Sequence, residues 1–190
     1  MTEPEIRPLE LYLGRAHELA ESIVNSLGNS PGYCPGESKK LIVFAESCTA
    51  GLAADFIVRI PGASNVFWGS FVSYRDDAKL KMLGVPEELI NRYGAVSRQV
   101  AIAMAEGALE KSGTSMAVSI TGLAGPDGDE KGTPIGTVWI GLTCLDESSP
   151  GTLLSGAKGY LFSGERNELR EAAATAALEL LLDRLTKTWL

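Results

Sequence analysis

The chain has 190 residues, a length typical of one domain with a substantial core. Hydrophobic residues make up 45% of the chain, and no apolar run reaches the roughly 18 residues of a membrane span, so we expect a soluble protein without a membrane partner. The 24 acidic and 17 basic residues give a net charge of −7, which disfavours nucleic acid as a partner.

The first part of the chain alternates helical and strand patterns. Residues 9–28 have apolar positions at helical spacing and predict an amphipathic helix. A Pro/Gly-rich loop at 28–38 follows, and then a short apolar run at 41–45 predicts a strand buried on both faces. Residues 49–60 predict a helix, and 66–74, rich in β-branched and aromatic residues, predict the next strand.

The middle of the chain predicts three helices in succession. The first is a short helix at 76–83, and Pro86 is placed to begin a second. Ser97 is placed to cap a longer helix that runs to about residue 112.

The last third of the chain returns to strands. A strand at 116–121 leads into a long loop, GLAGPDGDEKGTP. Residues 135–145 and 153–162 predict a hairpin-like strand pair, and 163–187 predict the last helix. This order predicts an α/β fold, a three-layer α/β/α sandwich with a mixed, mostly parallel sheet. We expect a single domain over 1–190, with residues 1–8 flexible.

The cysteines and the N-terminal segment bear on the compartment. Three cysteines (Cys34, Cys48 and Cys144) form an odd set without CxxC spacing, which predicts a reducing environment and no disulfide framework. The segment MTEPEIRPLE lacks the apolar core of a signal peptide. We therefore expect a cytoplasmic protein, and the sequence leaves a homo-oligomer possible.

The single histidine restricts the chemistry. His17 lies beside the apolar stripe of the first predicted helix, so we interpret it as a surface residue of that helix. A catalytic triad or Cys-His site would have to use it, and a zinc site with several histidines is excluded.

Three polar segments follow predicted parallel strands and should meet at one edge of the sheet: AESCTAG, YRDDAK and TGLAGPDG. In the first, Ser47 or Thr49 could simply cap the helix, but a hydroxyl at such a turn is also placed to attack a substrate. Backbone N–H groups of the same turn could then stabilise an oxyanion.

A serine nucleophile needs a base, and without a suitable histidine a lysine can serve where its surroundings favour the neutral amine. Lys79 is the candidate, although by itself it is more simply interpreted as a solvated charge on a helix. Cys48 is a rival nucleophile, with a small buried side chain as the simpler interpretation. Asp127 and Asp129 could hold Mg²⁺, but a solvated acidic turn is the simpler reading, so we expect no metal and no other cofactor.

Five motifs in order carry a resemblance to a known family: AESCTAG, FVSYRDDAKLKMLGV, YGAVS, SITGLAGPDG with GTVWIGL, and FSGERNELR. Over residues 10–188 the chain resembles the CinA C-terminal domain family of nicotinamide-nucleotide amidohydrolases. The resemblance implies the three-layer fold and hydrolysis of nicotinamide mononucleotide to nicotinate mononucleotide and ammonia. The alternative is a non-catalytic nucleotide- or partner-binding module of the same fold.

The resemblance also implies roles for individual residues. The family serine falls on Ser47, the family lysine on Lys79 and a site tyrosine on Tyr74, which together form the expected catalytic group. The expected substrate-binding residues share the same three segments and the start of the last helix: Cys48, Thr49, Gly51, Thr121, Gly122, Gly125 and Arg166. The chain departs from the family pattern at Ala50, where glycine is common, and at Arg75-Asp76, where Ser-Asn is common.

Overall fold

The computed structural model describes residues 3–28, 41–146, 148–149 and 151–186. A six-stranded sheet forms the middle layer, in the order β1-β6-β5-β4-β2-β3. The strands are β1 (Glu5–Ile6), β2 (Ile42–Glu46), β3 (Phe67–Val72), β4 (Met116–Gly122), β5 (Thr137–Leu145) and β6 (Leu153–Leu161). Strand β2 pairs in parallel with both β3 and β4, whereas β5 is antiparallel to both of its neighbours. The predicted α/β sandwich with a mixed sheet is therefore confirmed.

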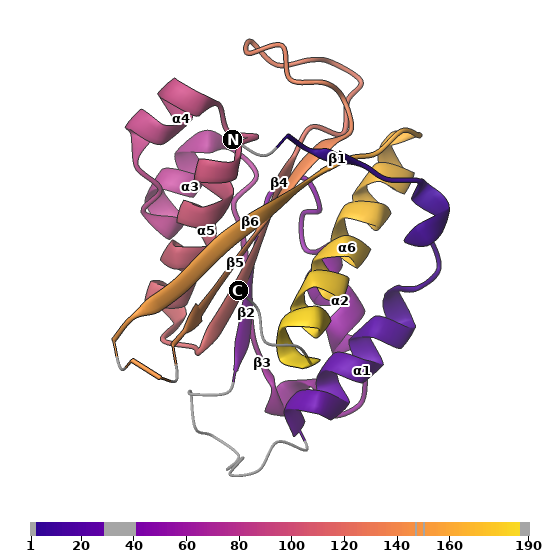
Figure 1. The fold of residues 1–190 in the computed structure, drawn as a ribbon, viewed down its shortest axis with the longest axis vertical. Coiled ribbons are helices and arrows are strands. Elements are labelled where there is room, and N and C mark those ends of the chain that lie inside the picture. The colour runs from indigo at the N-terminus through magenta and orange to yellow at the C-terminus, as the bar shows by residue number, and fades with distance from the viewer. Residues whose placement is uncertain (1–2, 29–40, 147, 150, 187–190) are drawn as a thin grey trace.

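Helices cover both faces of this sheet (Figure 1). One face carries α1 (Ala16–Gly28), α2 (Leu52–Val58) and α6 (Arg166–Thr186). The other carries α3 (Asp76–Leu83), α4 (Glu87–Tyr93) and α5 (Arg98–Ser112). Each interface has its own buried cluster, with Phe44 and Ile120 facing the first group of helices and Val43 and Met104 packed in the second. The alternation of Val43 and Phe44 explains why β2 is apolar throughout, since both faces of the strand are covered.

Two predicted helices differ from those observed, and one predicted cap is confirmed. The helix expected at 9–28 is interrupted, because a 3₁₀ turn (Leu9–Leu11) is followed by Gly14 at φ +79° before α1 begins. Helix α2 starts only at Leu52, because Ala50 and Gly51 both have positive φ. Ser97 caps α5 as expected, and its hydroxyl accepts a hydrogen bond from the Val100 N–H.

The N-terminal segment contains a short strand that the sequence did not predict. Residues 1–8 were expected to be flexible, but Glu5 and Ile6 pair in parallel with Tyr160 and Leu161 of β6. The Arg7 N–H continues the pairing by donating to the Leu161 carbonyl. Backbone pairing to an open sheet edge is independent of side-chain pattern, so two exposed residues gave no periodic signal. The expected loop at 28–38 lies outside the described residues from position 29 on.

No helix among the described ranges is long and apolar enough to span a bilayer. His17 is exposed on α1, as the helical pattern predicted.

Candidate active site

A cavity of about 750 Å³ opens at the carboxyl ends of β2, β3 and β4. Its wall is built from the segments that follow these three strands, together with Arg166 at the start of α6. The volume is that of an ordinary small-molecule site, and the position is the one at which open α/β sheets bind ligands. The three polar segments therefore meet at this edge of the sheet, as predicted.

Ser47 and Lys79 meet at one backbone carbonyl on the cavity wall. The Ser47 Oγ donates to the Tyr74 carbonyl oxygen at 3.4 Å, and the Lys79 Nζ donates to the same oxygen at 3.2 Å. Both residues line the cavity although both are nearly enclosed, with Lys79 only 2% exposed. The shared acceptor brings a hydroxyl and an amine from separate elements close together.

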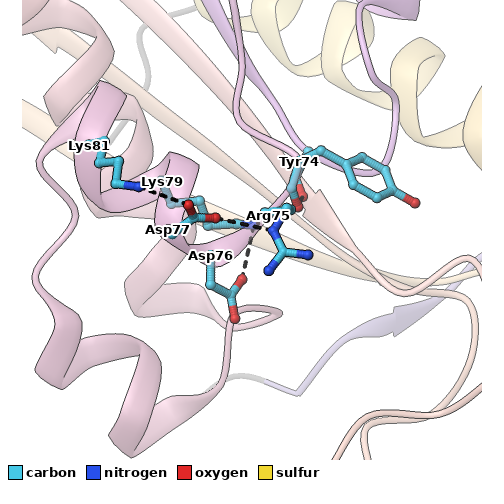
Figure 2. A network of polar contacts seen from close by, with 7 residues as sticks. Tyr74, Arg75, Asp76, Asp77, Lys79 and Lys81 are labelled. Atoms are coloured by element: carbon cyan, nitrogen blue, oxygen red, sulfur yellow. Dashed lines mark hydrogen bonds and ion pairs between the residues drawn. The ribbon is translucent and has the colours of Figure 1, made fainter.

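Lys79 projects from α3 toward the end of β3, as Figure 2 shows. Its Nζ also pairs with the Asp76 carboxylate, one turn earlier on the same helix, at 3.3 Å. The neighbouring charged residues form two separate ion pairs at the surface, in which Asp77 binds Arg75 and Lys81. Asp76 is therefore the one carboxylate within ion-pair distance of Lys79 among the described residues.

Tyr74 and Arg166 join two further parts of the wall. The Tyr74 side chain points away from α3 and is 53% exposed, while its backbone carbonyl faces Lys79 (Figure 2). The Arg166 Nη2 donates to the Tyr74 hydroxyl at 2.9 Å, and its Nη1 donates to the Gly125 carbonyl. Three predicted site residues from distant segments are thereby connected, and all of them line the cavity.

Thr121, Gly122 and Cys48 form the floor near the sheet. The Thr121 hydroxyl donates to the Ala95 carbonyl at 2.8 Å, so it ties β4 to the segment before α5. A Cβ on Gly122 would lie only 3.0 Å from the Cys48 Sγ and 2.9 Å from Val138. Glycine at this position therefore permits the turn at Ser47 and Cys48 to approach β4 closely.

Thr49 and Gly51 do not line the cavity, contrary to their expected contact with substrate. Thr49 is fully buried, and its Oγ1 has no hydrogen-bond partner among the described residues. Gly51 is at φ +94° and donates its N–H to Glu46. These two residues shape the turn behind the cavity wall, because the chain must reverse there before α2 begins.

The cap of α2 is a residue that sequence reasoning did not assign. Neither Ser47 nor Thr49 caps the helix; instead the buried Glu46 carboxyl group accepts hydrogen bonds from the N–H groups of Gly51, Ala53 and Ala54 at 2.9–3.1 Å. The Ser70 hydroxyl of β3 donates a fourth bond to it at 3.0 Å. The signal available in the sequence was an acidic residue at the end of an otherwise apolar strand.

Arg170 on α6 is the second residue that was missed. Its Nε donates to the Cys48 carbonyl at 3.1 Å and its Nη2 to the Thr49 carbonyl at 3.0 Å. These contacts span more than 120 residues of sequence, which no local pattern signals. The positive charge of the Arg170 guanidinium therefore lies at the carbonyl groups of this turn, and the negative charge of Glu46 lies at its N–H groups.

The acidic loop at 127–130 is organised by its own backbone. The Asp129 Oδ1 accepts hydrogen bonds from the N–H groups of Lys131 and Thr133. Partial burial raises the pKa of Asp129, but the hydrogen bonds from Thr133, Lys131 and Gly132 outweigh it, so the pKa lies below its usual value. No group of three or more metal-binding side chains is found in the described ranges.

Cys48 lines the cavity beside Ser47 but is chemically a poor rival. Burial raises the pKa of its thiol to about 12, and the nearby Glu46 charge acts in the same direction. The reactive species of cysteine is the thiolate, which is scarce at neutral pH when the pKa is so high.

Fold and site together define a class: an α/β/α domain with a small-molecule cavity at the carboxyl edge of its parallel strands and a serine–lysine pair in the wall. The chain belongs to the CinA C-terminal domain family, whose model matches residues 34–185.

Individual relatives agree with this assignment. A CinA-like protein of Syntrophomonas wolfei is 46% identical over 173 residues, covering 85% of this chain and 40% of the relative. A CinA-like protein of Geobacter metallireducens is 43% identical over 149 residues, covering 78% of this chain and 34% of the relative. The chain therefore spans well under half the length of these curated relatives.

Solved structures share the fold over nearly their whole length. The competence/damage inducible protein CihA of Agrobacterium tumefaciens superposes with a TM-score of 0.77 at 36% identity, covering 93% of this chain and 98% of that one. The competence damage-inducible protein A of Klebsiella pneumoniae gives a TM-score of 0.78 at 27% identity, covering 92% and 99%.

The first prediction concerns the thiol. Because Cys48 stays protonated far above neutral pH, iodoacetamide at pH 8 should leave it almost unlabelled in the folded protein and label it readily in guanidinium chloride. Peptide mass spectrometry measures both. Rapid labelling of Cys48 in the folded state would contradict the burial account.

The second prediction concerns Ala50, a non-glycine residue at φ +52°. A left-handed conformation costs a residue with a Cβ about 1–2 kcal/mol, and glycine avoids this cost. Part of the gain is cancelled, because glycine makes the unfolded chain more flexible and so stabilises the unfolded state. Ala50→Gly should therefore raise the free energy of unfolding by up to about 1 kcal/mol, measured by urea denaturation. Ala103→Gly, inside α5, is the control and should lower it by a similar amount. Equal destabilisation by both variants would show that position 50 is unstrained.

Proposed function

We propose that this domain hydrolyses the carboxamide of nicotinamide mononucleotide, giving nicotinate mononucleotide and ammonia. The observation that carries the proposal is the approach of Ser47 and Lys79 to the same Tyr74 carbonyl oxygen in the wall of the cavity. Membership of the CinA C-terminal domain family supports the reaction type through the resemblance set out above.

In the proposed mechanism, the Ser47 Oγ attacks the amide carbon while Lys79, neutral at that moment, takes the hydroxyl proton. Lys79 then returns this proton to the departing nitrogen, the C–N bond breaks and ammonia leaves. Water attacks the resulting ester on Ser47, with Lys79 as base again, and releases the acid product. Lys79 passes the proton taken from this water to the Ser47 Oγ as the ester bond breaks, so the enzyme is unchanged after the cycle.

The charges around the cavity suit this substrate. The mononucleotide combines a positively charged pyridinium ring with an anionic phosphate. The wall contains the cations Lys131 and Arg166 and also carboxylates, including Asp76 and Asp127. Arg166 is our proposed phosphate ligand, since its guanidinium is already at the rim and can bind phosphate through two N–H groups. Glu168 accepts from the Glu165 N–H at the start of α6, so the helix terminus itself is a less suitable anion site than Arg166.

The third prediction tests the chemistry directly. Incubation of the purified protein with nicotinamide mononucleotide should release ammonia and nicotinate mononucleotide in equal amounts, by coupled enzymatic assay and chromatography. Ser47→Ala should abolish turnover, and Lys79→Arg should nearly abolish it, because guanidinium cannot give up its proton at neutral pH. Cys48→Ala is the matched control and should keep most activity.

Three results would contradict the proposal. Inactivity of Cys48→Ala with full activity of Ser47→Ala would move the nucleophile to the thiol. Tight binding of the mononucleotide by the unmodified protein, with no ammonia released, would favour the non-catalytic binding module. Substantial kcat in Lys79→Arg would make Lys79 a binding residue and leave Tyr74 as the next candidate base.

A further inference from the structure

The turn that carries Ser47 is held from two sides by side chains of opposite charge. Glu46, at the end of β2, accepts three backbone N–H groups at the start of α2 and the Ser70 hydroxyl. Arg170, on α6, donates to the carbonyls of Cys48 and Thr49. Of the backbone groups of this turn, the Glu46 carboxyl group therefore binds N–H donors, and the Arg170 guanidinium binds carbonyl acceptors.

The backbone N–H groups from position 47 to position 55 can be followed one by one. Ser47 donates to the Ile120 carbonyl, Ala50 to Ser47 and Leu52 to Thr49. Gly51, Ala53 and Ala54 donate to Glu46, and Asp55 to the Gly51 carbonyl. Of these nine N–H groups, only those of Cys48 and Thr49 have no acceptor in another described residue.

The directions of these two N–H groups are fixed by the carbonyls of the same peptide units. In a trans peptide the C=O and N–H bonds point in opposite directions. Arg170 holds the Cys48 carbonyl, so the Thr49 N–H points away from Arg170. The Ala50 N–H holds the Ser47 carbonyl, which orients the Cys48 N–H, and Cys48 lines the cavity next to the nucleophile.

We propose that Glu46 and Arg170 are positioning residues that hold this turn so that the Cys48 N–H, with the Thr49 N–H beside it, stabilises the oxyanion formed at Ser47. The inference rests on the proposed function. It follows because Glu46 occupies the amides that begin α2, which leaves two successive N–H groups next to the nucleophile for a developing negative charge.

The test uses Arg170, whose removal leaves the hydrophobic core intact. Arg170→Met should lower kcat by about 100-fold, the loss typical of one misplaced oxyanion donor, with KM nearly unchanged. Arg170→Lys should recover part of that loss, because an ammonium can reach one of the two carbonyls but not both. Arg15→Met is the control: it removes an arginine that bonds the Leu11 carbonyl and Glu179 away from the cavity, and should leave kcat as it is.

A second measurement needs no substrate. Amide exchange followed by NMR should show faster exchange of the Ala50 N–H in Arg170→Met, because releasing the Thr49 carbonyl frees that peptide unit. Glu46→Gln should do the same for Gly51 and Ala53, since an amide NH₂ opposes their N–H groups.

The outcomes separate the two proposals. If the unmodified protein releases no ammonia while exchange changes as expected, the proposed function fails and the positioning of the turn stands. If the unmodified protein turns over the substrate and Arg170→Met keeps its kcat, the positioning role is overturned. The same holds if the loss of activity in Arg170→Met comes only from a higher KM. Unchanged exchange of Ala50 in Arg170→Met would overturn it as well.

Discussion

The buried carboxyl group of Glu46 is the contact on which the geometry of the site depends. It sits where β2 ends, and its four hydrogen bonds connect that strand to the start of α2 and to the neighbouring strand β3. A buried N–H without a partner costs about 1–3 kcal/mol, so three of them could not be left unpaired at this junction. The short helix α2, only seven residues long, has no side-chain cap of its own at Gly51. Glu46 supplies what the helix lacks.

This arrangement places the next residue of the chain on the other side of the sheet. Side chains alternate along a strand, so Glu46 faces α2 and Ser47 faces the side of α3. The Ser47 N–H still pairs with β4 through the Ile120 carbonyl, which anchors Ser47 to that strand. Tyr74 follows β3 and offers its carbonyl at the same level, where Ser47 and Lys79 both reach it. The site is therefore a consequence of the strand order β4-β2-β3 and of their parallel direction.

Sequence patterns predicted the fold and the position of the site because both depend on local signals. Buried strands appear as apolar runs, and polar segments after parallel strands must meet at one edge; on this basis Ser47, Tyr74 and Lys79 were expected together. The missing information was non-local. Rules for helix caps point to a nearby Ser or Thr, so they favoured Ser47 or Thr49 over Glu46, whose carboxyl group reaches five to eight positions ahead. The contacts of Arg170 and the pairing of β1 join segments far apart in the chain, which periodicity does not encode.

The most direct test of the account is to identify the atom that carries the acyl group. The protein would be mixed with nicotinamide mononucleotide, quenched in acid within one turnover, digested with trypsin and analysed by fragmentation mass spectrometry. The peptide covering residues 41–59 contains both candidate nucleophiles, Ser47 and Cys48. The account predicts a nicotinate-mononucleotide ester on Ser47 that disappears as the acid product accumulates. An adduct on Cys48, or turnover without any adduct on this peptide, would contradict it.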